Sequence, residues 1–154
     1  MENAKKNPTS VTVNAQYLKD LSFENPNAPF SFQDGEAPNF NMQFDLGAQQ
    51  VNENLYEVAL SFTIEGMQQE KKALIIEIKY AGLFTIHCDD KKELEMILLI
   101  QCPTLLFPYV RRIVSNLSTD AGYPPINLSP IDFYGFYMSK FNEEQQAVAN
   151  EAVN

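Results

Sequence analysis

Histidine, cysteine and tryptophan are nearly absent from this chain of 154 residues. It contains one histidine, two cysteines and no tryptophan. Histidine is the side chain that most readily exchanges protons near neutral pH, and it is the commonest metal ligand. His87 and its neighbour Cys88 point to opposite faces if they lie on a strand, so they do not form a pair of nucleophile and base. We therefore expect no catalytic site, no metal site and no cofactor.

Glycine is also scarce, and its spacing excludes two phosphate-binding motifs. The six glycines stand too far apart to write G-x-G-x-x-G or a phosphate loop. Nucleotide binding by these motifs is therefore excluded. The two cysteines, Cys88 and Cys102, are too few for a disulfide scaffold, which fits a reducing compartment.

Basic residues and long apolar runs are under-represented. Eleven Lys and Arg residues against twenty Asp and Glu residues give a net charge of −9, which repels nucleic-acid phosphates and anionic lipids. The charge-free stretch 96–110 contains two prolines and is shorter than the roughly 20 apolar residues that span a bilayer. An export signal requires an apolar run after its first basic residues, and no such run follows the first lysines here. We expect a cytoplasmic protein without nucleic-acid partners or direct membrane insertion.

Period-two alternation, which is typical of half-buried strands, occurs in four segments: 11–23, 39–46, 55–65 and 74–87. Leu18 interrupts the first alternation, which predicts a bulge near Lys19. Gly82 is expected to break or kink the last strand. The proline-rich segment 24–38 is a crossover loop whose two phenylalanines predict that it packs on the body. Consecutive strands with one apolar face each predict an α+β fold, in which helices cover one face of a four-stranded antiparallel sheet.

The second half of the chain is predicted to be helical. Asp90 and Glu93 form a capping box, and the run that follows is apolar on every side. One small domain covers one side of such a helix, so we expect a subunit interface here, made by Leu94, Ile97, Leu98 and Ile100. A long amphipathic helix follows Cys102 and ends near Gly122. A last helix, with Ser129 as its N-cap, precedes a polar acidic tail.

Aromatic side chains are in excess. The chain has eleven phenylalanines and seven tyrosines, more than a small sheet and its helices need to bury, and such a surplus usually marks an interface. Two readings stay open: self-association alone, and a groove that binds extended apolar polypeptide. The high net charge would keep such a particle soluble.

Three segments together resemble the SecB family of bacterial export chaperones: YLKDLSFENPNAP (17–29), CPTLLFPYVRR (102–112) and PPINLSPIDFYGFYM (124–138). The resemblance implies a dimer of dimers with the helices between two large sheets. It also implies an activity, that of an ATP-independent chaperone. Such a chaperone binds unfolded precursor proteins, keeps them translocation-competent and delivers them to the SecA motor for export.

The resemblance implies binding residues as well. The SecA contact of the family is acidic with a hydrophobic element, and the matching positions here are Asp20, Glu24, Ile75 and Glu77. Opposed charge makes such an encounter fast and salt-sensitive. The candidates for client binding lie beside the crossover loop and in the last segment, and they are Phe30, Phe40, Met42, Phe44, Tyr123, Phe136 and Tyr137.

We expect one chaperone domain over residues 11–141, between a disordered N-terminus (1–10) and a mobile acidic tail (142–154). Two alternatives remain. One is a non-catalytic oligomeric binding module for a single folded partner or apolar ligand. The other is an enzyme that uses a pair of carboxylates, which twenty acidic residues always allow. Arrest of the refolding of a denatured client, without nucleotide, separates the chaperone from both.

Overall fold

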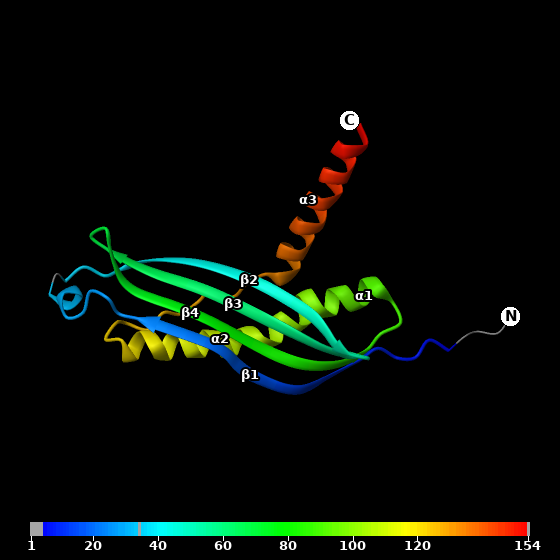
Figure 1. The fold of residues 1–154 in the computed structure, drawn as a ribbon, viewed down its shortest axis with the longest axis horizontal. Coiled ribbons are helices and arrows are strands. Elements are labelled where there is room, and N and C mark those ends of the chain that lie inside the picture. The colour runs from blue at the N-terminus through cyan, green and yellow to red at the C-terminus, as the bar shows by residue number, and fades with distance from the viewer. Residues whose placement is uncertain (1–4, 34, 154) are drawn as a thin grey trace.

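Four long antiparallel strands form one sheet, as the sequence predicts (Figure 1). In this computed structural model, which describes residues 5–33 and 35–153, the strands are β1 (Ser10–Glu24), β2 (Asn39–Asn52), β3 (Leu55–Gln68) and β4 (Lys71–His87). Their order is β1-β4-β3-β2, so β1 and β2 lie at opposite edges. The crossover loop, with the short 3-10 helix η1 (Phe30–Phe32), carries the chain between these edges.

Two bulges in β1 decide which face each of its side chains occupies. The pairing with β4 slips once at Asn14 and once at Lys19, so the bulge predicted near Lys19 is confirmed. Because each bulge inverts the alternation, Leu18 lies on the same face as Val13, and Tyr17 lies on the opposite face. A regular alternation from residue 11 would place Val13 and Tyr17 on one face. The first bulge, which a period-two pattern does not reveal, separates them.

β4 runs without interruption to its end, so Gly82 does not break the strand, and the kink predicted as the alternative stays a prediction. The glycine serves packing instead. A Cβ at this position would lie 2.6 Å from Cε2 of Phe84 and 2.9 Å from Cδ2 of Leu106. The missing side chain therefore makes room for a buried aromatic ring and for the helix above it.

One continuous helix follows the sheet, where the sequence predicts two. Its parts are α1 (Lys91–Met96), the π-helical η2 (Ile97–Gln101) and α2 (Cys102–Asp120). The predicted cap is confirmed, because Oδ1 of Asp90 accepts hydrogen bonds from the backbone N–H groups of Lys92 and Glu93 at 2.8 and 3.1 Å. Such a bond satisfies donors that the first helical turn leaves free.

The buried face of this helix packs on one face of the sheet. Leu106, Val110 and Val114 are fully buried, and the rings of Phe62 on β3 and Phe107 on α2 lie 6.0 Å apart. By length and composition alone the 30-residue helix formed by α1, η2 and α2 could cross a membrane. The sequence analysis excluded a membrane span because it considered only the shorter stretch 96–110. The core helix of a soluble protein meets the same criteria, and the contacts with the sheet are those of a core helix.

The last helix, α3 (Phe133–Val153), projects away from the sheet (Figure 1). Its cap is Asp132 and not the predicted Ser129, because Oδ1 of Asp132 accepts from the N–H of Gly135 at 3.0 Å. Residues 142–152 are exposed and helical, and their predicted mobility stays a prediction. At the other end, residues 5–9 are exposed and irregular. Residues 1–4 and 154 of the predicted termini lie outside the described residues.

Candidate functional site

The four residues matched to the SecA contact meet on the sheet face that the helices leave uncovered. Glu24 on β1 lies opposite Ile75 on β4. Glu77 on β4 lies opposite Ser22, which precedes Glu24 by two residues on β1. Asp20 follows on the same face of β1. Asp20, Glu24 and Glu77 are exposed, and Ile75 is half-buried. β1 and β4 therefore present three carboxylates on one face, with Ile75 opposite Glu24 and Lys79 opposite Asp20.

This acidic face is wider than the sequence analysis recognised. Glu65 on β3 lies opposite Ile75 and thus borders the same cluster on its other side. Its carboxylate stands 3.4 Å from Nζ of Lys72, an exposed pair that contributes little to stability. The signal for Glu65 was its place on the polar side of the alternation in 55–65, but alternation alone does not say which strands are neighbours.

A hydrogen-bonded network fixes the other end of the same face. Glu57 on β3 accepts hydrogen bonds from Nζ of Lys19 at 2.7 Å, from Nε2 of Gln49 at 3.2 Å and from the hydroxyl of Tyr17. The bonds from Lys19 and Tyr17 lower the pKa of Glu57. Burial, followed by the bond and charge of Glu57, raises the pKa of Tyr17 to about 12. The network ties the second bulge of β1 to β3, and Asp20 follows that bulge directly.

Some of the predicted client-binding residues lie at the crossover loop. Phe30 is 63% exposed, whereas Tyr123 is buried. The Tyr123 hydroxyl donates a hydrogen bond to Oγ of Ser31 at 2.9 Å, and its ring lies 5.3 Å from that of Phe32. The loop therefore packs on the body, as predicted. Tyr123 holds the loop in place and leaves Phe30 free to contact another molecule.

The other predicted client-binding residues lie along β2 and at the base of α3. Phe40 and Met42 are exposed on the edge strand β2. Further along, the ring of Phe44 lies 5.0 Å from that of Phe136, which joins β2 to α3. Tyr137 is buried beside them. The predicted set therefore divides into side chains that are exposed and rings that support them from below. Amino-acid composition does not distinguish these two groups.

The predicted interface in the apolar run is largely covered within one chain. Ile97 is buried, and Leu94, Leu98 and Ile100 pack on the core while half-buried. Both β2 and α3 contact η2. α3 therefore covers part of a second side of this helix, and a subunit interface at Leu94, Ile97, Leu98 and Ile100 stays a prediction.

Uncovered apolar surface lies instead along β1 and α2. On the helix side of β1 four large side chains are more than one-third exposed: Val13, Leu18, Leu21 and Phe23. On the flank of α2, Leu105 and Tyr109 are similarly exposed, and the Tyr109 ring stacks on that of Tyr80 at 5.8 Å. β1 is also an edge strand with one unpaired side. Such a strand is a template for pairing with another chain.

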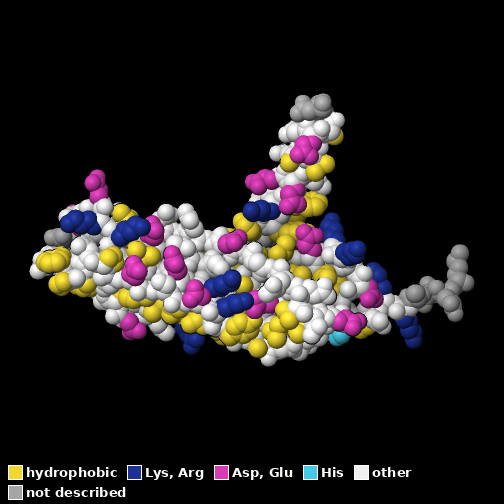
Figure 2. All heavy atoms as spheres, in the orientation of Figure 1, with side chains coloured by type: hydrophobic (Ala, Val, Ile, Leu, Met, Phe, Trp, Pro, Cys, Tyr) yellow, Lys and Arg dark blue, Asp and Glu magenta, His cyan; other side chains and the backbone are white. Residues whose placement is uncertain are grey.

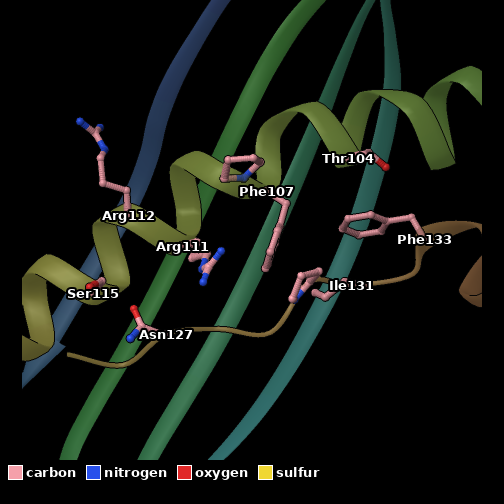
Figure 3. Close-up of a pocket in the computed structure, with 10 residues that line it drawn as sticks. Thr104, Phe107, Arg111, Arg112, Ser115, Asn127, Ile131 and Phe133 are labelled. Carbon is pink, nitrogen blue, oxygen red and sulfur yellow. The ribbon is translucent and has the colours of Figure 1, made fainter. Parts of the chain in front are cut away.

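A groove runs between α2 and the segment that leads to α3. Its volume is about 490 Å³. In Figure 3 the side chains of Phe107 and Ile131 face each other across it, and Arg111 lies between α2 and Asn127. Apolar walls with two cationic groups, Arg111 and Arg112, suit a chain with apolar side chains better than a small polar metabolite. No motif pointed to this groove, because its two walls are separate in sequence.

The described part of the chain offers little chemistry of other kinds. Within residues 5–33 and 35–153 there is no cluster of histidine, cysteine and acidic residues that could hold a metal ion. Burial raises the pKa of the Cys102 thiol to about 12, which keeps it protonated and unreactive. What the surfaces do offer is apolar contact, open strand edges and negative charge.

A solved structure shares this architecture. The SecB-like chaperone of Mycobacterium tuberculosis, in complex with a peptide from an antitoxin, matches with a TM-score of 0.65 over 79% of this chain and 90% of that chain, at 19% sequence identity. At this identity the match concerns the fold alone. It identifies the sheet with its long packed helix as a fold that a chaperone uses.

Sequence comparison is more specific. A family model described as preprotein translocase subunit SecB matches residues 3–144. The protein-export protein SecB of Rhizorhabdus wittichii is 42% identical over 149 residues, which cover 97% of this chain and 89% of that protein. That of Rhodopseudomonas palustris is 43% identical, with 93% and 92% covered. The class is therefore that of protein-export chaperones, which are not enzymes. Within it, the chain belongs to the SecB family.

Proposed function

We propose that this protein holds unfolded precursor proteins without ATP and delivers them to the SecA motor for export. The observation that carries the proposal is the amount of uncovered apolar surface on a strongly acidic chain. Phe30, Phe40 and Met42 lie beside the loop and on the open edge of β2. An extended chain can pair with such an edge through its backbone and place apolar side chains among exposed rings. Binding of this kind does not depend on one sequence.

The particle that binds clients is a dimer of dimers in this proposal. The unpaired edge of β1 and the apolar side chains Leu18, Leu21 and Phe23 lie on one strand, so pairing with a second copy covers both at once. The exposed flank of α2, with Leu105 and Tyr109, then faces the second dimer. Residues 11–141 form the chaperone domain, 142–154 serve as a tail, and the particle acts in the cytoplasm.

Holding is tested by refolding a slowly folding client from denaturant in the presence of the protein. We expect stoichiometric arrest without nucleotide. Met42→Asp should weaken the arrest, because it places a charge near the exposed ring of Phe40 on β2. Val51→Asp, at a more exposed position of the same strand, is the control. Refolding at the normal rate with excess protein would contradict the proposal. Binding of one folded partner only would favour a selective binding module instead.

The acidic face is the proposed SecA contact. Charge reversal tests it, because electrostatic attraction across an interface mainly raises the association rate. We expect Glu77→Lys to slow association with SecA and to reduce its salt dependence, while client arrest is unchanged. Glu143→Lys, an exposed position on α3, makes the same change of charge away from the sheet. Equal effects of the two variants would show that net charge matters and that this face does not.

A further inference from the structure

A hollow lies on the sheet face that the helices leave uncovered, beside the acidic face, and none of the assignments above uses it. Its volume is about 270 Å³. Two small residues, Gly47 on β2 and Ala59 on β3, lie opposite each other in it. A Cβ added at Gly47 would meet no atom within 4 Å, so the space above the glycine is open. Lys19, Glu57 and Lys79 stand around this space.

The carboxylate of the hollow is already occupied by the protein's own groups. Glu57 accepts the hydrogen bonds from Lys19, Gln49 and Tyr17 described above. Its charge is compensated by the ammonium group of Lys19 at 2.7 Å, and both of its oxygens have donors. This network therefore has little capacity to bind a further cation.

Lys79 is the cation of the hollow that has no such partner. In the part of the chain that the structure describes, the lysines in ion pairs are Lys19 and Lys72, so the exposed ammonium group of Lys79 pairs with no carboxylate. This holds even though Asp20 lies opposite Lys79 on β1. Figure 2 shows basic side chains near the middle of the sheet, with acidic side chains on either side of them. The hollow is therefore a position of positive charge within a largely acidic face.

We propose that this hollow binds an acidic side chain of the SecA motor. The carboxylate pairs with Nζ of Lys79, and the small residues Gly47 and Ala59 make room for it. Because Glu24 and Glu77 attract basic residues of the same partner, the sheet selects a surface on which charges of both signs stand in a fixed arrangement. This inference rests on the proposed delivery to SecA and adds Lys79 as a residue that determines the specificity of the contact.

The sign of one charge reversal separates this proposal from long-range attraction alone. Lys79→Glu makes the acidic face more negative. If net charge alone decided binding, the variant would bind the basic contact surface of SecA faster and more tightly. If an acidic side chain occupies the hollow, the variant removes an attraction and adds a repulsion between like charges. We therefore expect about threefold to tenfold weaker binding, mainly through faster dissociation.

Biolayer interferometry with immobilised SecA and the intact protein measures both rate constants. Gly47→Val is a second variant that changes no charge. Its side chain fills the open space of the hollow and suits a strand, and it should also weaken the binding of SecA. Lys71→Glu is the control for charge. It makes the same reversal at the exposed first residue of β4, outside the hollow, and it should bind SecA at least as tightly as the wild type.

Client arrest by all three variants should equal that of the wild type, which reports on their integrity. The two hollow variants act independently, so a folding defect in one leaves the other decisive. Equal or tighter binding of Lys79→Glu to SecA overturns the assignment, and so does unchanged binding of Gly47→Val. A smaller particle mass of Lys79→Glu in light scattering would assign the hollow to a contact between copies and would also overturn it. Absence of binding between the wild-type protein and SecA contradicts the proposed delivery itself.

Discussion

Replacement of Gly82 by alanine tests the packing between the sheet and the long helix. The added Cβ would lie 2.6 and 2.7 Å from two ring carbons of Phe84 and 2.9 Å from Cδ2 of Leu106. Both neighbours are completely buried, so neither side chain moves into solvent to make room. We therefore expect Gly82→Ala to destabilise the protein.

The magnitude follows from two opposing contributions. An extra methyl group in a well-packed core costs about 1–3 kcal/mol. Against this, alanine lowers the conformational entropy of the unfolded chain and recovers about 0.4–1 kcal/mol. The net loss is about 1–2 kcal/mol, which lowers Tm by roughly 2–8 °C for a chain of this length.

Differential scanning calorimetry at one fixed protein concentration measures this change, because assembly makes Tm depend on concentration. Gly47→Ala on β2 is the matched control. Its added Cβ meets no atom within 4 Å, so the entropic gain stands alone and Tm should stay the same or rise. If Gly82→Ala were as stable as Gly47→Ala, the close approach of Phe84 and Leu106 to residue 82 would be refuted.

Two further substitutions test the hydrogen-bonded networks. Glu57→Gln should lose about 0.5–1 kcal/mol at neutral pH, the value of a partly exposed charge-assisted bond. Because folding lowers the pKa of Glu57, its stabilisation is present above the unfolded-state pKa and disappears as pH falls through the folded-state pKa. Denaturant unfolding at several pH values should therefore show the two proteins converging in acid, with Glu53→Gln as control, and a constant difference would refute the role of the charge. Tyr123→Phe should cost about 1–2 kcal/mol by leaving the buried Ser31 hydroxyl without its donor, and limited proteolysis should cut the crossover loop faster, whereas exposed Tyr134→Phe should match wild type in both assays.

The strands were predictable because each has one apolar face, and that pattern has a fixed period of two. β3 is the clearest example, with Val58, Leu60, Phe62 and Ile64 all buried. The pattern failed where the backbone departs from a regular strand. The bulge at Asn14 moved Tyr17 to the outer face, and Gly82 served packing where an isolated glycine suggested a break.

The helices were less predictable because their ends and neighbours depend on tertiary contacts. The two predicted helices join through η2, and Pro103, next to the expected boundary, follows directly after this π-helical turn inside the continuous helix. The contact between α3 and η2 was also not predicted. α3 covers a side of that helix which the sequence analysis assigned to another subunit.

The candidate surfaces were predictable to different degrees. The register of β1 on β4 brings Asp20, Glu24, Ile75 and Glu77 to one face, and their role as the SecA contact stays a prediction. The aromatic set was predicted as one group, although Tyr123 and Tyr137 are buried and Phe30 and Phe40 are exposed. Exposure depends on which ring covers which, and neither the residue type nor its periodicity contains that information.

The central claim is that one subunit has more apolar surface than it covers, and that assembly and client binding cover the remainder. Light scattering coupled to size-exclusion chromatography measures the mass of the particle alone and after mixing with a denatured client. The account predicts about four times the 17.5 kDa of one chain for the particle alone, and an additional mass that corresponds to bound client. A particle of one chain's mass that elutes apart from the denatured client would contradict it.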